Sequence, residues 1–122
     1  MSANILTVDD SASIRMTTKI ALTNAGYSIT EAVDGADGLA KAKSGSFDLI
    51  VTDLNMPNMN GLEMIEALRQ SPAHTGIPII FLTTESDADM KTRAKAAGAT
   101  GWVTKPFDPE NLVKIVRKVL GR

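Results

Sequence analysis

Short apolar runs alternate with longer amphipathic segments along the chain, and this alternation restricts the fold more than any other feature. The runs cover residues 5–8, 27–32, 49–52, 77–82 and 102–104. Three of them carry Val and Ile with little polar alternation, which is typical of strands that helices cover on both faces. The pattern therefore predicts a parallel sheet.

Apolar residues recur at helical spacing between and after these runs. The helical segments are marked by Ile14, Ala21, Leu22 and Ala25 before Gly26; by Ala36, Leu39 and Ala40; by Leu62, Ile65 and Leu68; by Met90, Ala94 and Ala97 before Gly98; and by Leu112, Ile115, Val116 and Val119, with Asp108 and Pro109 ahead and Gly121 behind. Five strand-then-helix units are too few for an eight-stranded barrel. The expected fold is an open, doubly wound α/β sheet.

Size and composition narrow the class of protein. The chain has 122 residues, of which 43% are apolar and 22% are charged, so we expect one folded domain over residues 1–122 with no effector domain. A net charge of -1 argues against nucleic-acid binding, and the absence of Cys together with a single His excludes thiol chemistry and multi-histidine zinc sites. No apolar stretch reaches membrane-spanning length, so a cytoplasmic protein without membrane insertion is expected.

Polar residues follow the predicted strands where the strands end. Asp9 and Asp10 end the first, Asp53 the third, Thr83 the fourth and Lys105 the fifth. In the strand order 2-1-3-4-5 the first and third strands are neighbours, which brings the three carboxylates together. Two such charges about 4 Å apart repel by roughly 4 kcal/mol at an effective dielectric of about 20. The cluster therefore predicts a bound cation, and oxygen ligands favour Mg²⁺.

Each of these residues also has a purely structural interpretation. The segment Asp9–Ser11 could simply cap the first helix, Thr83 could be an ordinary strand-end hydroxyl, and Lys105 could be a solvated charge. Asp53 fits such an interpretation less well, because a loop separates it from the next helix.

An aspartate with a divalent cation and a lysine beside it matches phosphoryl transfer. The carboxylate of Asp53 is a competent phosphoryl acceptor, and cations stabilise the oxygens in transfer. General acid/base chemistry fits less well, because no histidine is nearby and a metal-bound carboxylate compensated by Lys105 is not expected to have a raised pKa.

These residues also carry a family resemblance over essentially the whole chain. The chain resembles the receiver domain of two-component response regulators, most closely the stand-alone CheY-type chemotaxis regulators. The matching motifs are Val8-Asp9-Asp10-Ser11, Thr52-Asp53-Leu54-Asn55-Met56-Pro57 with Gly61, Leu82-Thr83-Thr84, Ala97-Gly98-Ala99 and Thr104-Lys105-Pro106-Phe107. The resemblance implies a flavodoxin-like fold with strand order 2-1-3-4-5.

The resemblance assigns Asp53 as the phosphoacceptor. Asp9 or Asp10, together with Asp53 and the backbone carbonyl of Asn55, would hold Mg²⁺.

Further roles follow from the same motifs. Thr83 would donate a hydrogen bond to the phosphoryl group, Lys105 would pair with it, and the Lys105–Pro106 bond would be cis. Asn55 and Glu85 stand two residues after Asp53 and Thr83, where CheY-like proteins tune hydrolysis of the phosphoaspartate. A short-lived phosphoryl group is therefore predicted.

The chain departs from the family pattern at Trp102. Three residues before the lysine, family members usually carry a Tyr or Phe ring that moves with phosphorylation. The larger Trp102 ring is interpreted either as packing on an edge strand against the fourth helix or as an anchor for partners.

The resemblance also implies partners. These are a CheA-like histidine kinase and a downstream target such as a flagellar motor switch protein, bound through the fourth helix, fifth strand and fifth helix. Basic residues on these helices suit an acidic partner, although a solvated charged face explains them equally: Lys91, Arg93, Lys95, Lys114, Arg117 and Lys118.

Other functions stay open beside motor control. The chain could be a phosphate sink or a phosphorelay intermediate without motor binding. A small Mg²⁺-dependent aspartyl phosphatase of the haloacid-dehalogenase type matches less well, because such enzymes carry a second Asp where this chain has Asn55. A flavodoxin-like cofactor binder is disfavoured because Asp9 and Asp10 would repel a phosphate.

Overall fold

The fold alternates strands and helices from end to end. The computed structural model describes residues 3–54, 56, 59–71, 76–83, 88–105 and 107–121, without the side chains of residues 88–90. The strands are β1 (Asn4–Val8), β2 (Ser28–Ala32), β3 (Leu49–Asp53), β4 (Ile79–Thr83) and β5 (Gly101–Thr104). The helices are α1 (Ala12–Asn24), α2 (Gly35–Ser44), α3 (Gly61–Arg69), α4 (Ala88–Ala96) and α5 (Pro109–Leu120).

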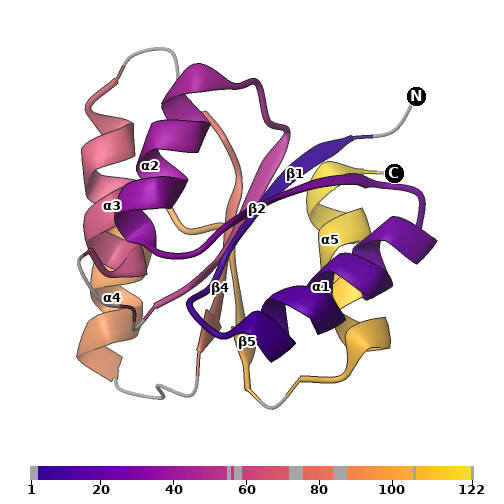
Figure 1. Ribbon diagram of the computed structural model, residues 1–122. Coiled ribbons are helices and arrows are strands. Elements are labelled where there is room, and N and C mark those ends of the chain that lie inside the picture. The colour runs from indigo at the N-terminus through magenta and orange to yellow at the C-terminus, as the bar shows by residue number, and fades with distance from the viewer. Residues whose placement is uncertain are drawn as a thin grey trace.

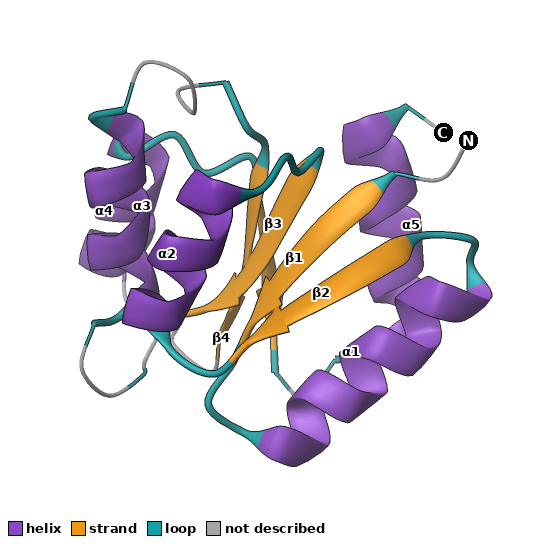
Figure 2. Ribbon diagram, turned by 45° about the horizontal axis from the view of Figure 1, so that its top comes forward, coloured by secondary structure: helices purple, strands orange, loops and turns teal. Residues whose placement is uncertain are grey.

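The strands form one parallel sheet in the order β2-β1-β3-β4-β5. Helices α2, α3 and α4 cover one face, and α1 and α5 cover the other (Figure 1). Figure 2 shows the strands between these two helical layers. The predicted doubly wound α/β fold and its strand order are confirmed, with strand ends that differ from the predicted ones by at most two residues.

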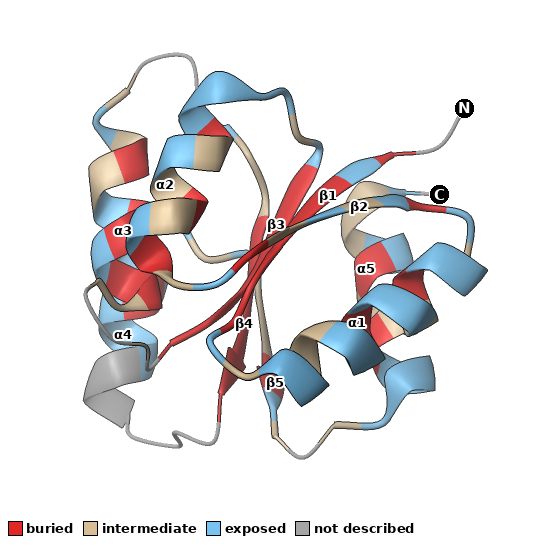
Figure 3. Ribbon diagram, viewed as in Figure 1, coloured by how far each residue is buried: buried red, intermediate tan, exposed pale blue. Residues whose placement is uncertain are grey.

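Alternate residues of the central strands feed two separate cores. Leu6, Ile50 and Phe81 pack toward α2, α3 and α4, whereas Val51 and Leu82 pack toward α1 and α5. Every residue of β3 and β4 is buried (Figure 3). The sequences of these strands are therefore mostly apolar and end in polar residues. That ending places polar side chains at one edge of the sheet.

One helix buries a face that differs from its apolar markers, and another buries a polar residue on the predicted face. In α2 the buried residues are Gly35, Gly38 and Ala42, and a Cβ at Gly38 would lie 2.7 Å from the sulfur atom of Met64. The helix therefore packs closely on α3 through small residues, which leave no apolar period in the sequence. In α1 the buried residues are Leu22 and Thr18, and the Thr18 hydroxyl has no hydrogen-bond partner among the described residues.

The last helix begins and ends where its sequence predicts. The Asp108 side chain accepts a hydrogen bond from the backbone N–H of Glu110 at 3.0 Å, and Pro109 occupies the first turn. Gly121 ends the helix with a left-handed φ of 73°. None of the described helices is both long and apolar enough to cross a membrane.

Candidate functional site

The site is built around Asp53, the last residue of β3. Because β3 lies between β1 and β4, Asp53 stands at the middle of the polar edge, and it is only 8% exposed. Its Oδ1 atom accepts a hydrogen bond from the backbone N–H of Leu54 at 2.8 Å. The carbonyl of Leu54 in turn accepts the N–H of Gly61 at 2.8 Å, which ties the start of α3 to the site.

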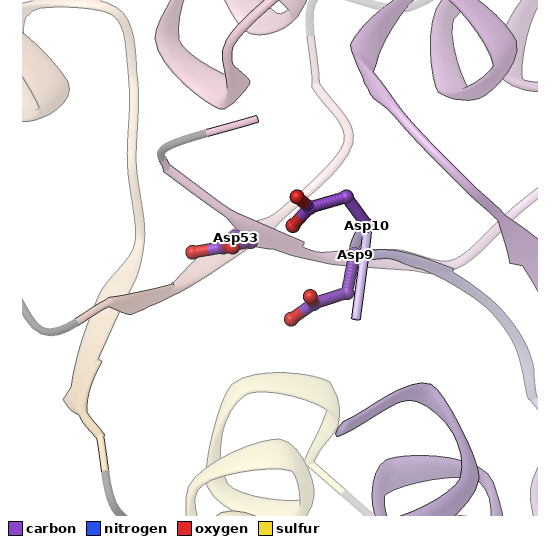
Figure 4. A group of neighbouring side chains, drawn as sticks. All are labelled: Asp9, Asp10 and Asp53. Atoms are coloured by element: carbon purple, nitrogen blue, oxygen red, sulfur yellow. The ribbon is translucent and has the colours of Figure 1, made fainter. Parts of the chain in front are cut away.

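Two further carboxylates come from the chain just after β1. One carboxylate oxygen of each of Asp9, Asp10 and Asp53 lies within 4.8 Å of the others. Figure 4 shows Asp9 and Asp10 side by side after β1, with Asp53 next to them on β3. Asp9 is buried and Asp10 is exposed, so the cluster is open to solvent on the Asp10 side.

Lys105, directly after β5, supplies the positive charge of the site. Its Nζ atom lies 2.9 Å from Oδ2 of Asp9 and 3.4 Å from Oδ2 of Asp53. The backbone N–H of Lys105 donates to the carbonyl of Thr83 at 2.9 Å, and Thr83 is fully buried at the end of β4. Parallel pairing of β4 with β5 thus brings both residues to the edge where Asp53 lies.

The electrostatics of Asp53 are dominated by its burial. Burial raises the pKa of the Asp53 carboxyl above its usual value, and the negative charge of Asp9 raises it further. Lys105 and the Leu54 N–H act in the opposite direction and offset only part of this. Sequence reasoning expected no raised pKa for a carboxylate compensated by both a metal ion and lysine. Lys105 by itself only partly offsets the effects that raise the pKa of Asp53.

The donor atoms of this cluster fit a hard divalent cation. All three side chains offer oxygen, and Mg²⁺ prefers oxygen ligands while keeping several waters. The open side at Asp10 leaves room for those waters. Burial and the negative charge of Asp9, which raise the pKa of Asp53, both disfavour its ionised form, and a bound cation would offset that cost.

Several residues with predicted roles lie outside the described part of the chain. They are Asn55, Glu85 and Pro106, together with Pro57 and Thr84 of the motifs. Their roles in metal binding, in hydrolysis and in a cis bond at Lys105–Pro106 remain predictions.

Trp102 lies on the edge strand β5, away from the carboxylates. Its ring centroid is 5.9 Å from that of Phe81, and Nζ of Lys91 on α4 lies 5.6 Å from the ring. The indole N–H is buried and has no hydrogen-bond partner among the described residues. Both interpretations of Trp102, packing and partner binding, stay predictions.

Sequence reasoning missed one polar residue that touches the site. Nη1 of Arg15, in the second turn of α1, donates to the backbone carbonyl of Asp9 at 2.7 Å. The sequence indicates this contact only through the position of Arg15. A long side chain near the start of a helix can reach back to the loop that precedes the helix. A charge at such a position is common on solvated helices, so the signal was weak.

Comparison with known proteins places this site in a family. The chain matches the family model of the response regulator receiver domain over residues 5–117. It is 38% identical over 118 residues to the response regulator ArlR of Staphylococcus aureus, an alignment that covers 97% of this chain and 52% of the relative. The chain thus spans about half the length of the curated relatives it matches.

Solved structures agree with the family match. The chemotaxis response regulator CheY4 of Vibrio cholerae is 46% identical with a TM-score of 0.93, over 98% of this chain and 100% of that one. A CheY-like receiver domain protein of Methanospirillum hungatei is 29% identical with a TM-score of 0.93, over 99% and 95%. The chain therefore belongs to the receiver-domain family of two-component response regulators.

Proposed function

We propose that Asp53 accepts a phosphoryl group from a phosphohistidine of a sensor kinase and that the phosphorylated protein changes its binding to a downstream target. Family membership implies both a histidine kinase and a target. The observation that supports the acceptor role most is the position of Lys105, 3.4 Å from Asp53 and 2.9 Å from Asp9. A fixed cation at that place would balance the phosphoryl oxygens as they arrive.

In the proposed transfer, a carboxylate oxygen of Asp53 attacks the phosphorus atom of the donor. The bond between phosphorus and the histidine nitrogen breaks, and its electron pair stays on that nitrogen. The product is an acyl phosphate on Asp53. Water later attacks the phosphorus, which releases inorganic phosphate and restores the carboxylate, so the protein would catalyse its own phosphorylation and dephosphorylation.

Asp9, Asp10 and Asp53, with the backbone carbonyl of Asn55, are the residues that would hold Mg²⁺. The bound ion would supply electrostatic stabilisation of the transferred oxygens. Lys105 holds Asp9 in place through its 2.9 Å contact. The same ammonium is near enough to Asp53 to follow the new phosphoryl group.

Phosphorylation would act on the fold through the end of β4. The phosphoryl group adds about -1.5 to -2 charges, and the Thr83 hydroxyl and the Lys105 ammonium are the groups proposed to meet it. Thr83 ends the strand that leads toward α4, so its movement would shift the face formed by α4, β5 and α5. In the proposal Asn55 and Glu85 keep this signal short-lived.

The α4, β5 and α5 face is the proposed output surface. Open hollows of about 380 and 490 Å³ flank β5 and share Thr100, Gly101 and Trp102. Lys91 and Lys95 line the first, and Lys118 lines the second. An acidic target segment would suit this lining. Likeness to CheY4, a chemotaxis response regulator, supports a CheA-like kinase as donor and a flagellar motor switch protein as target.

Intact mass spectrometry tests the acceptor role. The protein is incubated with acetyl phosphate, with and without Mg²⁺, as wild type, Asp53→Asn and Asp108→Asn. We expect one Mg²⁺-dependent phosphoryl adduct on the wild type and on Asp108→Asn, where asparagine still caps α5. An adduct that persists in Asp53→Asn would contradict the proposal.

Binding measurements test the output role. The wild type, phosphorylated as above, is titrated with a flagellar motor switch protein, and we expect tighter binding than without phosphorylation. Equal affinity in both states would remove the motor role and favour a phosphate sink or a phosphorelay intermediate.

A further inference from the structure

Arg15 reaches from α1 back to the acidic cluster. Its Nη1 atom donates to the backbone carbonyl oxygen of Asp9 at 2.7 Å, and its side chain is only 19% exposed. That carbonyl belongs to the peptide group that joins Asp9 to Asp10. Because a peptide group is planar, holding its oxygen also fixes the direction in which Asp10 leaves it.

The hydrogen bond from Arg15 matters mainly for Asp10, because every other polar atom of Asp9 already has a hydrogen-bond partner. The Asp9 N–H donates to the carbonyl of Ala32 at 3.1 Å, Oδ1 accepts from the Ser11 N–H at 2.9 Å, and Oδ2 accepts from Lys105 at 2.9 Å. In the described part of the chain, no hydrogen bond holds the Asp10 carboxylate. The direction of Asp10 therefore depends on its backbone.

Glu31 on β2 steadies the guanidinium from the far side. Its carboxylate lies 4.0 Å from Nε of Arg15, and it also pairs with Nζ of Lys19 at 3.7 Å. Arg15 is thus set between β2 and the chain after β1. Lys19 shares the same acidic partner but makes no hydrogen bond or ion pair with Asp9 within the described residues, which makes it a matched control.

We propose that Arg15 is a positioning residue for the cation site, which presets the peptide between Asp9 and Asp10 so that the Asp10 carboxylate faces Asp53. The inference rests on the proposed function, because it concerns the residues that would hold Mg²⁺. A carboxylate already turned toward the site loses less conformational freedom when the ion binds. Removing Arg15 should therefore weaken Mg²⁺ binding.

The sign of this effect separates positioning from simple electrostatics. Arg15 and Mg²⁺ are both positive, so loss of the charge alone would remove a repulsion and strengthen Mg²⁺ binding. Positioning demands the opposite. A rise in the dissociation constant when the positive charge is deleted cannot come from the charge itself.

Calorimetric titration with MgCl₂ tests the inference on four proteins: wild type, Arg15→Met, Arg15→Lys and Lys19→Met. We expect the Mg²⁺ dissociation constant to rise about tenfold in Arg15→Met, as for residues that orient metal ligands. Arg15→Lys, which can still donate to the Asp9 carbonyl, should recover part of the loss. Lys19→Met should match the wild type. An unchanged or lower dissociation constant in Arg15→Met would overturn the inference.

Phosphorylation by acetyl phosphate gives a second readout. In Arg15→Met the Mg²⁺ concentration at half-maximal rate should rise by the same factor, while the rate at saturating Mg²⁺ stays at the wild-type value. A loss confined to the saturated rate would overturn the positioning role. If Arg15→Met does not fold, Arg15→Gln, which also deletes the positive charge, decides the matter: weaker Mg²⁺ binding supports the inference, and unchanged or tighter binding overturns it.

The two proposals fail in different ways. If the wild type binds Mg²⁺ but takes no phosphoryl group, the acceptor role is wrong and calorimetry still decides the role of Arg15. If the wild type binds no Mg²⁺, the inference about Arg15 is overturned together with the proposed metal site.

Discussion

The ionised carboxylate of Asp53 lowers the free energy of unfolding when no cation is bound. Folding raises the pKa of its carboxyl, chiefly through burial and next through Asp9. The folded state therefore holds the proton more tightly than the unfolded chain, and ionisation costs folding free energy. That cost is complete above the raised pKa and disappears below the usual value of 3.8.

Replacing Asp53 by asparagine should remove this cost. Without Mg²⁺ at neutral pH, Asp53→Asn should unfold at a higher temperature than the wild type, because a buried charge is removed and the repulsion from Asp9 is relieved, while Lys105 keeps Asp9 as a partner. The advantage should shrink as the pH falls toward 4, about the usual range of a carboxyl. Thermal unfolding followed by circular dichroism from neutral to acidic pH measures it. A constant difference over that range would contradict the prediction.

Gly61 is required where the backbone of α3 passes the site. A Cβ at Gly61 would overlap the carbonyl oxygen of Asp53 and lie 3.1 Å from the Phe81 ring. Gly61→Ala should lower the free energy of unfolding by about 1–3 kcal/mol and displace Asp53. Gly76→Ala is the control, because no atom of the described residues lies within 4 Å of a Cβ built at Gly76. Urea unfolding compares the two, and equal effects would show that the close approach is unimportant.

At the level of the helices, Arg69 links the end of α3 to the turn after α4 and to the approach to β4. Its guanidinium, at the end of α3, donates to the carbonyls of Ala97 at 3.2 Å, Ile77 at 2.8 Å and Gly98 at 3.1 Å. Burial there lowers the pKa of Arg69. These carbonyls belong to the turn after α4 and the approach to β4, so one side chain stabilises the end of α4 opposite to the acidic cluster.

Loss of this contact should loosen α4 selectively. Arg69→Met should cost about 2 kcal/mol of unfolding free energy, since hydrogen bonds from charged groups are the stronger class. Hydrogen exchange should accelerate most at the Ala99 amide, which bonds to Ala94 at 2.9 Å. Arg93→Met, at an exposed site of α4, should leave both quantities unchanged. Exchange that accelerates evenly over all elements would contradict a local role.

The elements themselves could be predicted because their signals are local. Apolar runs gave the strands, and Asp108, Pro109 and Gly121 gave the ends of α5. The buried face of α2 could not be predicted, because Gly38 packs by being small and leaves no hydrophobic period. Burial of Thr18 in α1 could not be predicted either, because a polar residue leaves no hydrophobic signal at its position.

The site could be predicted as far as strand ends determine it. Asp9, Asp10 and Asp53 meet because parallel strands end at one edge, and this needs only the strand order. The contact of Arg15 with a backbone carbonyl and the close approach at Gly61 depend on where two elements pass each other. No residue spacing in the chain encodes such distances.

At the scale of the whole molecule, a bound cation should raise the free energy of unfolding. Mg²⁺ that binds only the folded chain would stabilise it by about 2.7 kcal/mol at a concentration one hundred times its dissociation constant. The melting temperature of the wild type should therefore rise by several degrees with MgCl₂ and return with EDTA. Asp53→Asn, with one ligand neutralised, should respond much less. Equal responses in the two proteins would place the ion elsewhere.

The single tryptophan of the chain has a practical consequence. Trp102 lies on β5 with Lys91 beside its ring, in the lining of both hollows of the proposed output surface. The tryptophan emission of the protein, excited beyond the absorption of its one tyrosine, therefore comes from that surface alone. Partner binding and its response to phosphorylation can be followed by Trp102 fluorescence in the unlabelled protein, because this residue lies on the surface where the partner is proposed to bind.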